Sequence, residues 1–300
     1  MYLIDSHCHI HDRSCYNHAL SRQQIGRKLL KGYPDFPHEP DDFIPEKIIV
    51  RAHDAGIKKM ICIGTSHEDS LNARDFAEKY HADGVFWSYG IHPDEASELQ
   101  SPFGKRLATT GASAQASPVT TGRSEARLPK GTLNSLAPAL VAIGEVGLDY
   151  HNDANRPAQQ KLFERMLQLA LDYDLPLIFH VREAFDDFFA MLDNFPSARG
   201  VVHSFSDNRE NLIKSLDHGF YIGVNGLSTF APELPIADIP LDRILLETDA
   251  PFLTPAPFRG TINEPARIRE ICAHVSKLKG ESEADIARIT TKNAEQLFHI

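Results

Sequence analysis

The sequence has few cysteines, no long apolar run and no excess of basic residues. Its four cysteines are scattered, with no CxxC spacing, which is typical of free cytosolic thiols. No apolar run approaches the ~20 residues that a membrane-spanning helix needs. The opening residues, MYLIDSHCHI, lack the basic and apolar regions of a signal peptide. We therefore expect a cytoplasmic protein that has no membrane segment.

Basic residues are outnumbered: the chain has 31 Lys and Arg against 41 Asp and Glu, a net charge of −10. This balance argues against a protein that grips duplex nucleic acid with a broad basic surface. It does not exclude phosphate chemistry, because bound cations can dominate the potential of a site.

The sequence does contain a regular alternation of short apolar runs and helical periodicity. Several runs are almost entirely apolar, as expected for strands of a parallel sheet that are buried on both faces. The expected strands are 2–8, 59–64, 85–90, 140–144, 177–180, 200–203, 220–224 and 243–247. The expected helices are 45–55, 68–80, 156–173, 184–192, 208–217, 263–279 and 282–298. Eight strand–helix pairs predict an α/β fold, a single-domain (β/α)8 TIM barrel over residues 1–300. A doubly wound open sheet is the alternative, but no glycine-rich phosphate loop supports it.

Two long segments interrupt the alternation, after strands one and three. Residues 11–44 are long for a βα loop, and residues 101–138 are rich in Ser, Thr, Ala, Gly and Pro, which is typical of a mobile insertion. Both follow strands, so we expect both as extended loops on the catalytic face of the barrel. Residues 11–33 and 101–138 each carry five Lys or Arg against one acidic residue. They form either a basic collar that guides a phosphate backbone or ordinary solvated loops.

His7 and His9 lie one residue apart at the end of the first expected strand. Because side chains alternate across a strand, both imidazoles should point to one face and Cys8 to the other. Two imidazoles at this end of a barrel strand can chelate one cation, although the HxH pattern also occurs by chance. Asp5 should share the face of His7, either as a satisfied buried residue or as a carboxylate that orients a ligand.

Further polar residues end later strands and should meet at the same mouth. Glu145, His180, His203 and Asp249 each follow an apolar run. Glu145 could pair within the core or bridge two cations, whereas Asp249 suits a ligand that also accepts a proton from water. Glu247 is more suited to a supporting role. His92 follows strand three and could contact substrate or buttress its loop. The remaining histidines, such as His53, His81 and His274, are interpreted as surface residues.

With these residues in place, the chain resembles the TatD family of metal-dependent hydrolases, within the amidohydrolase-like barrels. The matching segments span nearly the whole chain and are DSHCHI, GIHPDE, AIGEVGLDY, PLIFHVREAFDD, GVVHSFS, LLETDAPFLTP, RGTINEPARI and TTKNAEQLF. The resemblance implies that His7, His9, Glu145 and Asp249 hold one divalent cation. It implies that Glu145, His180 and His203 hold a second, so that Glu145 bridges. Arg182 and Arg259 would then face the substrate.

A site with two divalent cations and two ligand carboxylates retains a charge of about +2, which favours an anionic group such as a phosphodiester. The leading interpretation is therefore phosphodiester hydrolysis, and the resemblance implies single-stranded DNA or DNA 3′ ends as substrate. Asp249 and Glu145 would be the catalytic residues. Hydrolysis of an ester or amide, such as deacylation of D-aminoacyl-tRNA, is the alternative, and a metal-bearing scaffold protein is a third. The sequence does not identify the cations (Zn, Mn, Mg or Co) and indicates no obligate protein partner.

Overall fold

The structure is a computed structural model that describes residues 2–26, 43–100, 139–151 and 155–300. Its strands are β1 (Leu3–Cys8), β2 (Ile57–Ile63), β3 (Val85–Tyr89), β4 (Leu140–Asp149), β5 (Leu177–Arg182), β6 (Gly200–Val202), β7 (Tyr221–Val224) and β8 (Ile244–Leu246). Its α-helices are α1 (Arg13–Gly26), α2 (Pro45–Asp54), α3 (His67–Tyr80), α5 (Arg156–Tyr173), α6 (Phe185–Leu192), α7 (Arg209–Asp217), α8 (Ile268–Lys279) and α9 (Glu283–Phe298). No helix in these ranges is both long and apolar enough to cross a membrane.

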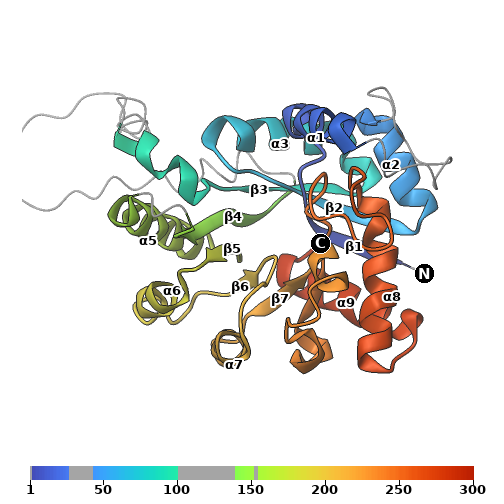
Figure 1. The fold of residues 1–300 in the computed structure, drawn as a ribbon. Helices are drawn as coiled ribbons and strands as arrows, with labels where there is room; N and C mark the ends of the chain where they lie inside the picture. The colour runs from blue at the N-terminus through green and yellow to red at the C-terminus, as the bar shows by residue number, and fades with distance from the viewer. Residues whose placement is uncertain (1, 27–42, 101–138, 152–154) are drawn as a thin grey trace, which may run out of the picture.

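The eight strands form one parallel sheet in the order β1 to β8, and the helices surround it (Figure 1). The sheet closes where β1 meets the segment after β8. There the His9 N–H donates to the Ala250 carbonyl at 2.8 Å, and the Asp249 N–H donates to the His7 carbonyl at 2.8 Å. The predicted (β/α)8 barrel is confirmed, because every pair of sequential strands is parallel and adjacent.

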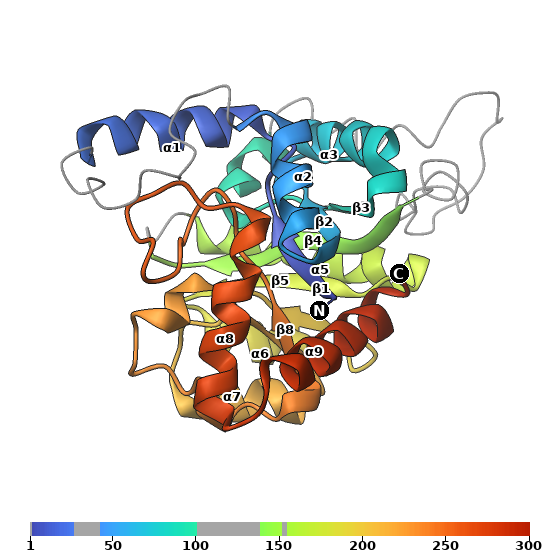
Figure 2. The same ribbon diagram turned by 90° about the vertical axis from the view of Figure 1, so that its right-hand side faces the viewer.

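Helix α9 closes the end of the barrel at which the strands begin. Its residues Leu297 and Phe298 join a buried apolar cluster with side chains from the strands, among them Ile4, Ile61, Ile178 and Leu245. In the side view of Figure 2, α9 lies at the end of the barrel opposite to α1. The Ser282 side chain accepts a hydrogen bond from the Asp285 N–H and caps the helix, as the sequence predicts. With one end filled by α9, the site must lie at the other end.

The segment after β1 differs from expectation. Residues 11–44 were expected to be an extended loop, but α1 occupies residues 13–26 of it. Asp12 explains where this helix begins, since its Oδ1 accepts hydrogen bonds from the N–H groups of Ser14 (2.7 Å) and Cys15 (3.3 Å). Residues 27–42 and 101–138, which carry most of the predicted basic collar, lie outside the described residues, so the collar stays a prediction.

Two register shifts aim ligand residues into the mouth. Along β1, Asp5 pairs with Met60 and Cys8 with Cys62, so that β1 advances three residues while β2 advances two. Along β4, Gly144 pairs with Ile178 and Val146 with Phe179, which leaves Glu145 as an extra residue. Such β-bulges bend a strand locally and redirect a side chain. Strand β4 therefore continues past Gly144 to Asp149, beyond its predicted end.

Candidate metal centre

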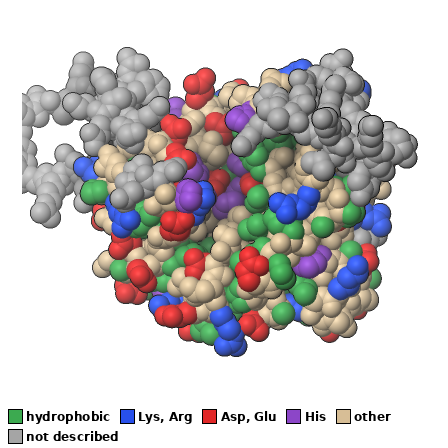
Figure 3. All heavy atoms as spheres, viewed as in Figure 1, with side chains coloured by type: hydrophobic (Ala, Val, Ile, Leu, Met, Phe, Trp, Pro, Cys, Tyr) green, Lys and Arg blue, Asp and Glu red, His purple; other side chains and the backbone are tan. Residues whose placement is uncertain are grey.

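Imidazole and carboxylate side chains converge at the ends of β1, β4, β5 and β6. His7, His9, Glu145 and His203 are buried, with at most 6% of their surface exposed. Figure 3 shows histidine side chains gathered in a hollow at the centre of this face, with acidic side chains around it. Burial of this many ionisable groups in one place requires that they pair with one another or bind metal ions.

A first group of ligand atoms comes from His7, His9 and Asp249. The Nε2 atoms of His7 and His9 each lie 3.5 Å from Asp249 Oδ1. Tetrahedral coordination with bonds near 2.1 Å separates ligand atoms by about 3.4 Å. Asp249 adopts a left-handed backbone conformation (φ 58°), a strained geometry for a non-glycine residue of the kind that concentrates at functional sites. These three side chains could therefore hold one cation.

Glu145 lies between this group and a second one. Its Oε1 is 2.7 Å from His180 Nδ1 and 2.9 Å from His203 Nε2, whereas its Oε2 is 3.6 Å from His7 Nε2. The Glu145 carboxylate thus faces imidazoles from both groups. Its Oε2 faces His7, and its Oε1 faces His180 and His203. The rings of His7 and His203 stack at 3.9 Å, so the two groups are in direct contact.

Where no cation is bound, the charges at the mouth favour protons that are shared between Glu145 and the neighbouring imidazoles. Burial opposes charge on Glu145, but His203 and His180 outweigh it and hold its pKa well below the usual range. Burial also opposes protonation of His203, yet Glu145 raises the pKa of that imidazole well above its usual value. Burial and the neighbouring His203 lower the pKa of His7, which keeps its ring neutral. A cation at this site would displace the protons of His203 and His180, so metal affinity should rise with pH.

Unpaired polar atoms also fit a metal centre. His7 Nε2, His203 Nδ1 and Glu247 Oε2 are buried without a hydrogen-bond partner in the described part of the chain. Such orphaned groups are costly and are rare in proteins. A bound cation would satisfy His7 Nε2 directly. Imidazole together with carboxylate is a donor set that suits Zn, Mn, Fe or Co, so the residues fit divalent metal ions.

Known proteins share this barrel over its whole length. The family model described as TatD related DNase matches residues 4–299. The chain belongs to this family. The uncharacterized metal-dependent hydrolase YcfH of Escherichia coli (strain K12) is 30% identical over 311 residues, which cover all of this chain and 97% of YcfH.

Two other relatives connect the family to nucleic acids and to a solved fold. The 3′-5′ ssDNA/RNA exonuclease TatD of Cronobacter sakazakii (strain ATCC BAA-894) is 32% identical over 88% of this chain and 93% of the relative. The crystal structure of YJJV, a TatD homolog from Escherichia coli K12, has a TM-score of 0.74 and 27% identity, and covers 99% of this chain and 98% of that chain. The protein is thus a TatD-family metal-dependent hydrolase.

Two carboxylates lie beside the histidines of the second group in this TatD-family barrel, and of the two Asp149 is within hydrogen-bond distance of its histidine. Asp149 Oδ2 lies 3.0 Å from His180 Nε2, and Glu247 Oε1 lies 3.6 Å from His203 Nδ1. Glu247 also accepts a hydrogen bond from the Ser204 N–H at 2.6 Å. The supporting role expected for Glu247 agrees with these contacts. Asp149 was not singled out from the sequence, although it stands in the same AIGEVGLDY segment as Glu145.

Asp5 acts on the backbone rather than on an imidazole. Its carboxylate accepts hydrogen bonds from the N–H (2.9 Å) and hydroxyl (2.5 Å) of Thr248, and from the His7 N–H at 3.3 Å. Burial raises the pKa of Asp5 to about 8. Asp5 therefore ties β1 to the segment that carries Asp249. These contacts agree with the expectation of a satisfied buried residue, and the alternative of a carboxylate that orients a ligand stays a prediction.

The three predicted substrate residues have different surroundings. His92 lies against the second ligand group, with Nε2 3.8 Å from Glu145 Oε1 and its ring 4.4 Å from that of His180. Arg182 is exposed at the end of β5, close enough to Asp149 to lower the pKa of that carboxyl together with His180. The Arg259 guanidinium is exposed and lies 3.5 Å from the centre of the Phe230 ring.

The interpretation of the remaining histidines as surface residues is wrong for His11. Its side chain is 0% exposed, and its Nε2 lies 3.0 Å from Asp69 Oδ1. Burial opposes its charge, but Asp69 and Cys62 raise its pKa to about 10. The His11 ring lies 6.2 Å from that of His9, directly behind the metal centre. The sequence carries no local signal for this burial, because His11 follows the strand and its partner comes from α3.

Proposed function

We propose that this protein hydrolyses phosphodiester bonds with two divalent cations, acting on single-stranded DNA or DNA 3′ ends. The observation that carries the proposal is the position of Glu145, whose two oxygens face imidazoles of both ligand groups. Two cations that share a carboxylate can stabilise both the attacking and the leaving oxygen of a phosphodiester. The relative named as a 3′-5′ ssDNA/RNA exonuclease supports this substrate class.

In this proposal the ligand residues fall into two sets, one for each cation, which share Glu145. His7, His9, Asp249 and Glu145 would hold one cation, and Glu145, His180 and His203 the other. When bound, the cations would supply Lewis acidity, which makes water a better nucleophile near neutral pH. The Asp249 side chain is 15% exposed while that of His7 is 0% exposed, so Asp249 can reach an incoming water and accept its proton. Arg182 and Arg259 would offset the charge of the phosphodiester.

The test is hydrolysis of an end-labelled single-stranded oligonucleotide by metal-stripped protein that has been reconstituted with Mg, Mn, Co or Zn. Glu145→Gln keeps the size of the side chain but removes its charge, and Glu210→Ala, on the surface of α7, is the matched control. We expect metal-dependent cleavage that the control retains and that Glu145→Gln loses. Equal inactivity of the wild type and Glu145→Gln with all four metals would refute the proposal.

One observation favours hydrolysis of an aminoacyl ester as the second candidate. A cavity of about 350 Å³ is lined by residues that follow β4, β5 and β6. Among them are one cation, Arg156, and four carboxylates, namely Glu183, Asp186, Asp187 and Asp207. Such a lining suits an ammonium group better than a phosphate. The same metal-reconstituted samples should therefore be assayed with D-aminoacyl-tRNA, where release of the amino acid without cleavage of the oligonucleotide would favour deacylation.

A further inference from the structure

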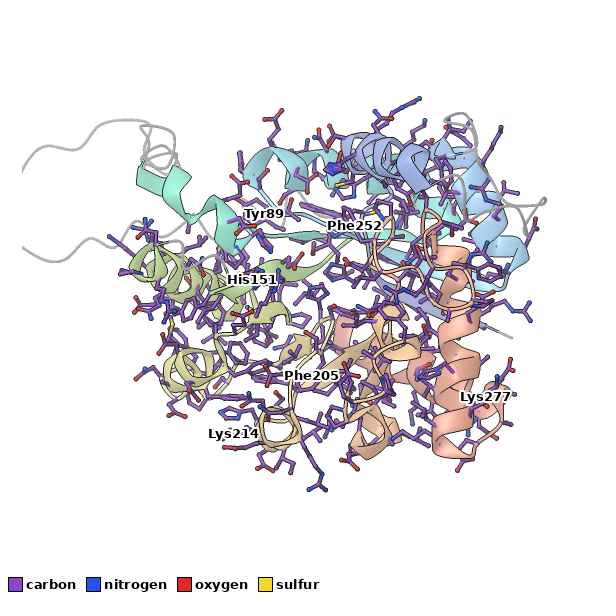
Figure 4. All side chains as sticks on the ribbon, in the orientation of Figure 1. Tyr89, His151, Phe205, Lys214, Phe252 and Lys277 are labelled. Carbon is purple, nitrogen blue, oxygen red and sulfur yellow. The ribbon has the colours of Figure 1, made fainter. Side chains whose placement is uncertain are left out.

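Phe252 is an exposed aromatic residue at the rim of the metal centre. Among the described residues, the only large aromatic side chains that are at least 36% exposed are Tyr2 and Phe252. Tyr2 precedes β1 at the end of the barrel that α9 closes. Phe252 follows Asp249 by three residues, and its ring centre lies 6.4 Å from that of His9 at an angle of 64°. Figure 4 shows it beside the mouth, on the segment between β8 and α8.

Hydrogen bonds hold the backbone of Phe252 in a defined place. The Phe252 N–H donates to the Asp249 carbonyl at 2.8 Å. The Asn263 side chain, which is 0% exposed, donates to the carbonyls of Phe252 (2.6 Å) and Thr248 (2.8 Å). The segment that carries Phe252 is thus tied to the ligand Asp249. A rigid aromatic residue loses little conformational freedom when it packs on a ligand.

An apolar ring at this position has a chemical use if the substrate is a nucleic acid. Bases stack on aromatic side chains in proteins that bind single strands, and they do so with little dependence on sequence because every base has a π-face. A base in a duplex is already stacked on its neighbours and must be extruded first. A platform beside the cations therefore selects nucleotides that are unpaired.

We propose that Phe252 is the stacking platform for the base of the nucleotide adjoining the scissile phosphodiester. This rests on the proposed function and deepens it, since it makes Phe252 the residue that selects unpaired nucleotides. Phosphate contacts to cations and arginines position the strand but do not contact the bases. The selection of unpaired nucleotides therefore comes from stacking of the base on the Phe252 ring.

The test pairs variants of Phe252 with oligonucleotides that lack one base. A single abasic site is placed in turn at each position of a single-stranded oligonucleotide, and kcat/KM is measured for the metal-reconstituted wild type, Phe252→Ala, Phe252→Leu and Phe252→Trp. Phe252→Leu keeps apolar bulk without a π-face. Tyr2→Ala removes the other large aromatic side chain that is exposed among the described residues, at the opposite end of the barrel, and is the matched control. A duplex of the same sequence measures the selection for unpaired bases.

We expect removal of the base at one position to lower kcat/KM of the wild type by about 5- to 150-fold. Phe252→Ala should lower kcat/KM on the intact strand by a similar factor. On the abasic strand, the variant should have the same kcat/KM as the wild type. Phe252→Trp should retain the wild-type preference, and Phe252→Ala should discriminate less between single strand and duplex.

If removal of the base and Phe252→Ala lower kcat/KM by factors that multiply, Phe252 is not the platform. The same holds if Phe252→Ala has the kcat/KM of the wild type on the intact strand. In both cases the nuclease function stands. If the wild type neither binds nor cleaves any intact oligonucleotide, the proposed function fails and the platform fails with it.

Discussion

The carboxylate of Asp149 accepts a hydrogen bond from the imidazole of His180, with Oδ2 3.0 Å from Nε2. The other nitrogen of the ring, Nδ1, lies 2.7 Å from Glu145 Oε1. A proton held on Nε2 by Asp149 would leave Nδ1 as the nitrogen that could bind a cation. Asp149 thereby orients the His180 ring and, with a cation at Nδ1, would keep the proton on Nε2.

Asp149→Ala should weaken the binding of one of two cations by about 10- to 100-fold, as expected when a carboxylate behind a histidine ligand is lost. Asp149→Asn, whose amide oxygen can still accept the hydrogen bond from His180 Nε2, should lose less. Calorimetric titration of metal-stripped protein measures the affinities and the stoichiometry. Asp193→Ala, an exposed aspartate next to α6, is the control. Equal affinities for Asp149→Ala and Asp193→Ala would contradict this role.

Gly90 leaves room for the backbone at the bulge of β4. A Cβ atom at this position would collide with the backbone of Gly144 and Glu145. Gly90→Ala should destabilise the protein by roughly 1–3 kcal/mol, as overpacking does, and should also weaken metal binding because Glu145 moves. Gly219→Ala should cost about 1 kcal/mol, because Gly219 has φ 78°, yet nothing lies near its Cβ position and metal binding should not change. Thermal unfolding and metal titration of both variants separate the two effects.

The buried His11–Asp69 pair should make stability depend on pH. The pKa of His11 is raised to about 10, against an unfolded value near 6.5. The contribution of the His11 charge to the free energy of unfolding is therefore fully present below pH 6.5 and is lost as the pH rises through 10. The pKa of Asp69 is lowered to about 2, because the His11 and Thr65 hydrogen bonds outweigh burial, so its contribution is lost only as the pH falls below about 4.

His11→Gln should cost roughly 1.5–3 kcal/mol at pH 6, the value of a hydrogen bond to a charged group. The cost should shrink as the pH approaches 10. Denaturant unfolding of metal-stripped protein between pH 6 and pH 10 measures this. A cost that stays constant over that interval would mean that His11 is not charged in the folded protein.

Arg259 should act on substrate affinity rather than on the metal centre. Its guanidinium rests on the Phe230 ring, which orients it without consuming its charge. Arg259→Ala should raise KM for an oligonucleotide by about 10- to 100-fold and reduce the slope of log KM against log salt by about one. Phe230→Leu should produce a smaller change in the same direction. A fall in kcat with unchanged KM would instead assign Arg259 to the chemical step.

The sequence by itself determined the eight-stranded barrel, because each strand is a short apolar run and each helix carries its own periodicity. It also predicted which residues could bind metal, since His7, His9, Glu145, His180, His203 and Asp249 all follow such runs, although β4 and β5 extend beyond Glu145 and His180. Parallel strands bring these residues to one mouth, where the structure places them close together, whereas their role as metal ligands stays a prediction.

Only the tertiary structure decided how these residues meet. The shifts of β1 against β2 and of β4 against β5 depend on hydrogen bonds between strands, and no local pattern encodes them. The pairing of Asp149 with His180 joins two neighbouring strands across 31 positions, and that of His11 with Asp69 joins segments 58 positions apart. The backbone of Phe252 is held by Asn263, eleven positions along the chain. The sequence gives the chemical nature of each side chain, but the distances between side chains and their burial arise only when the barrel closes.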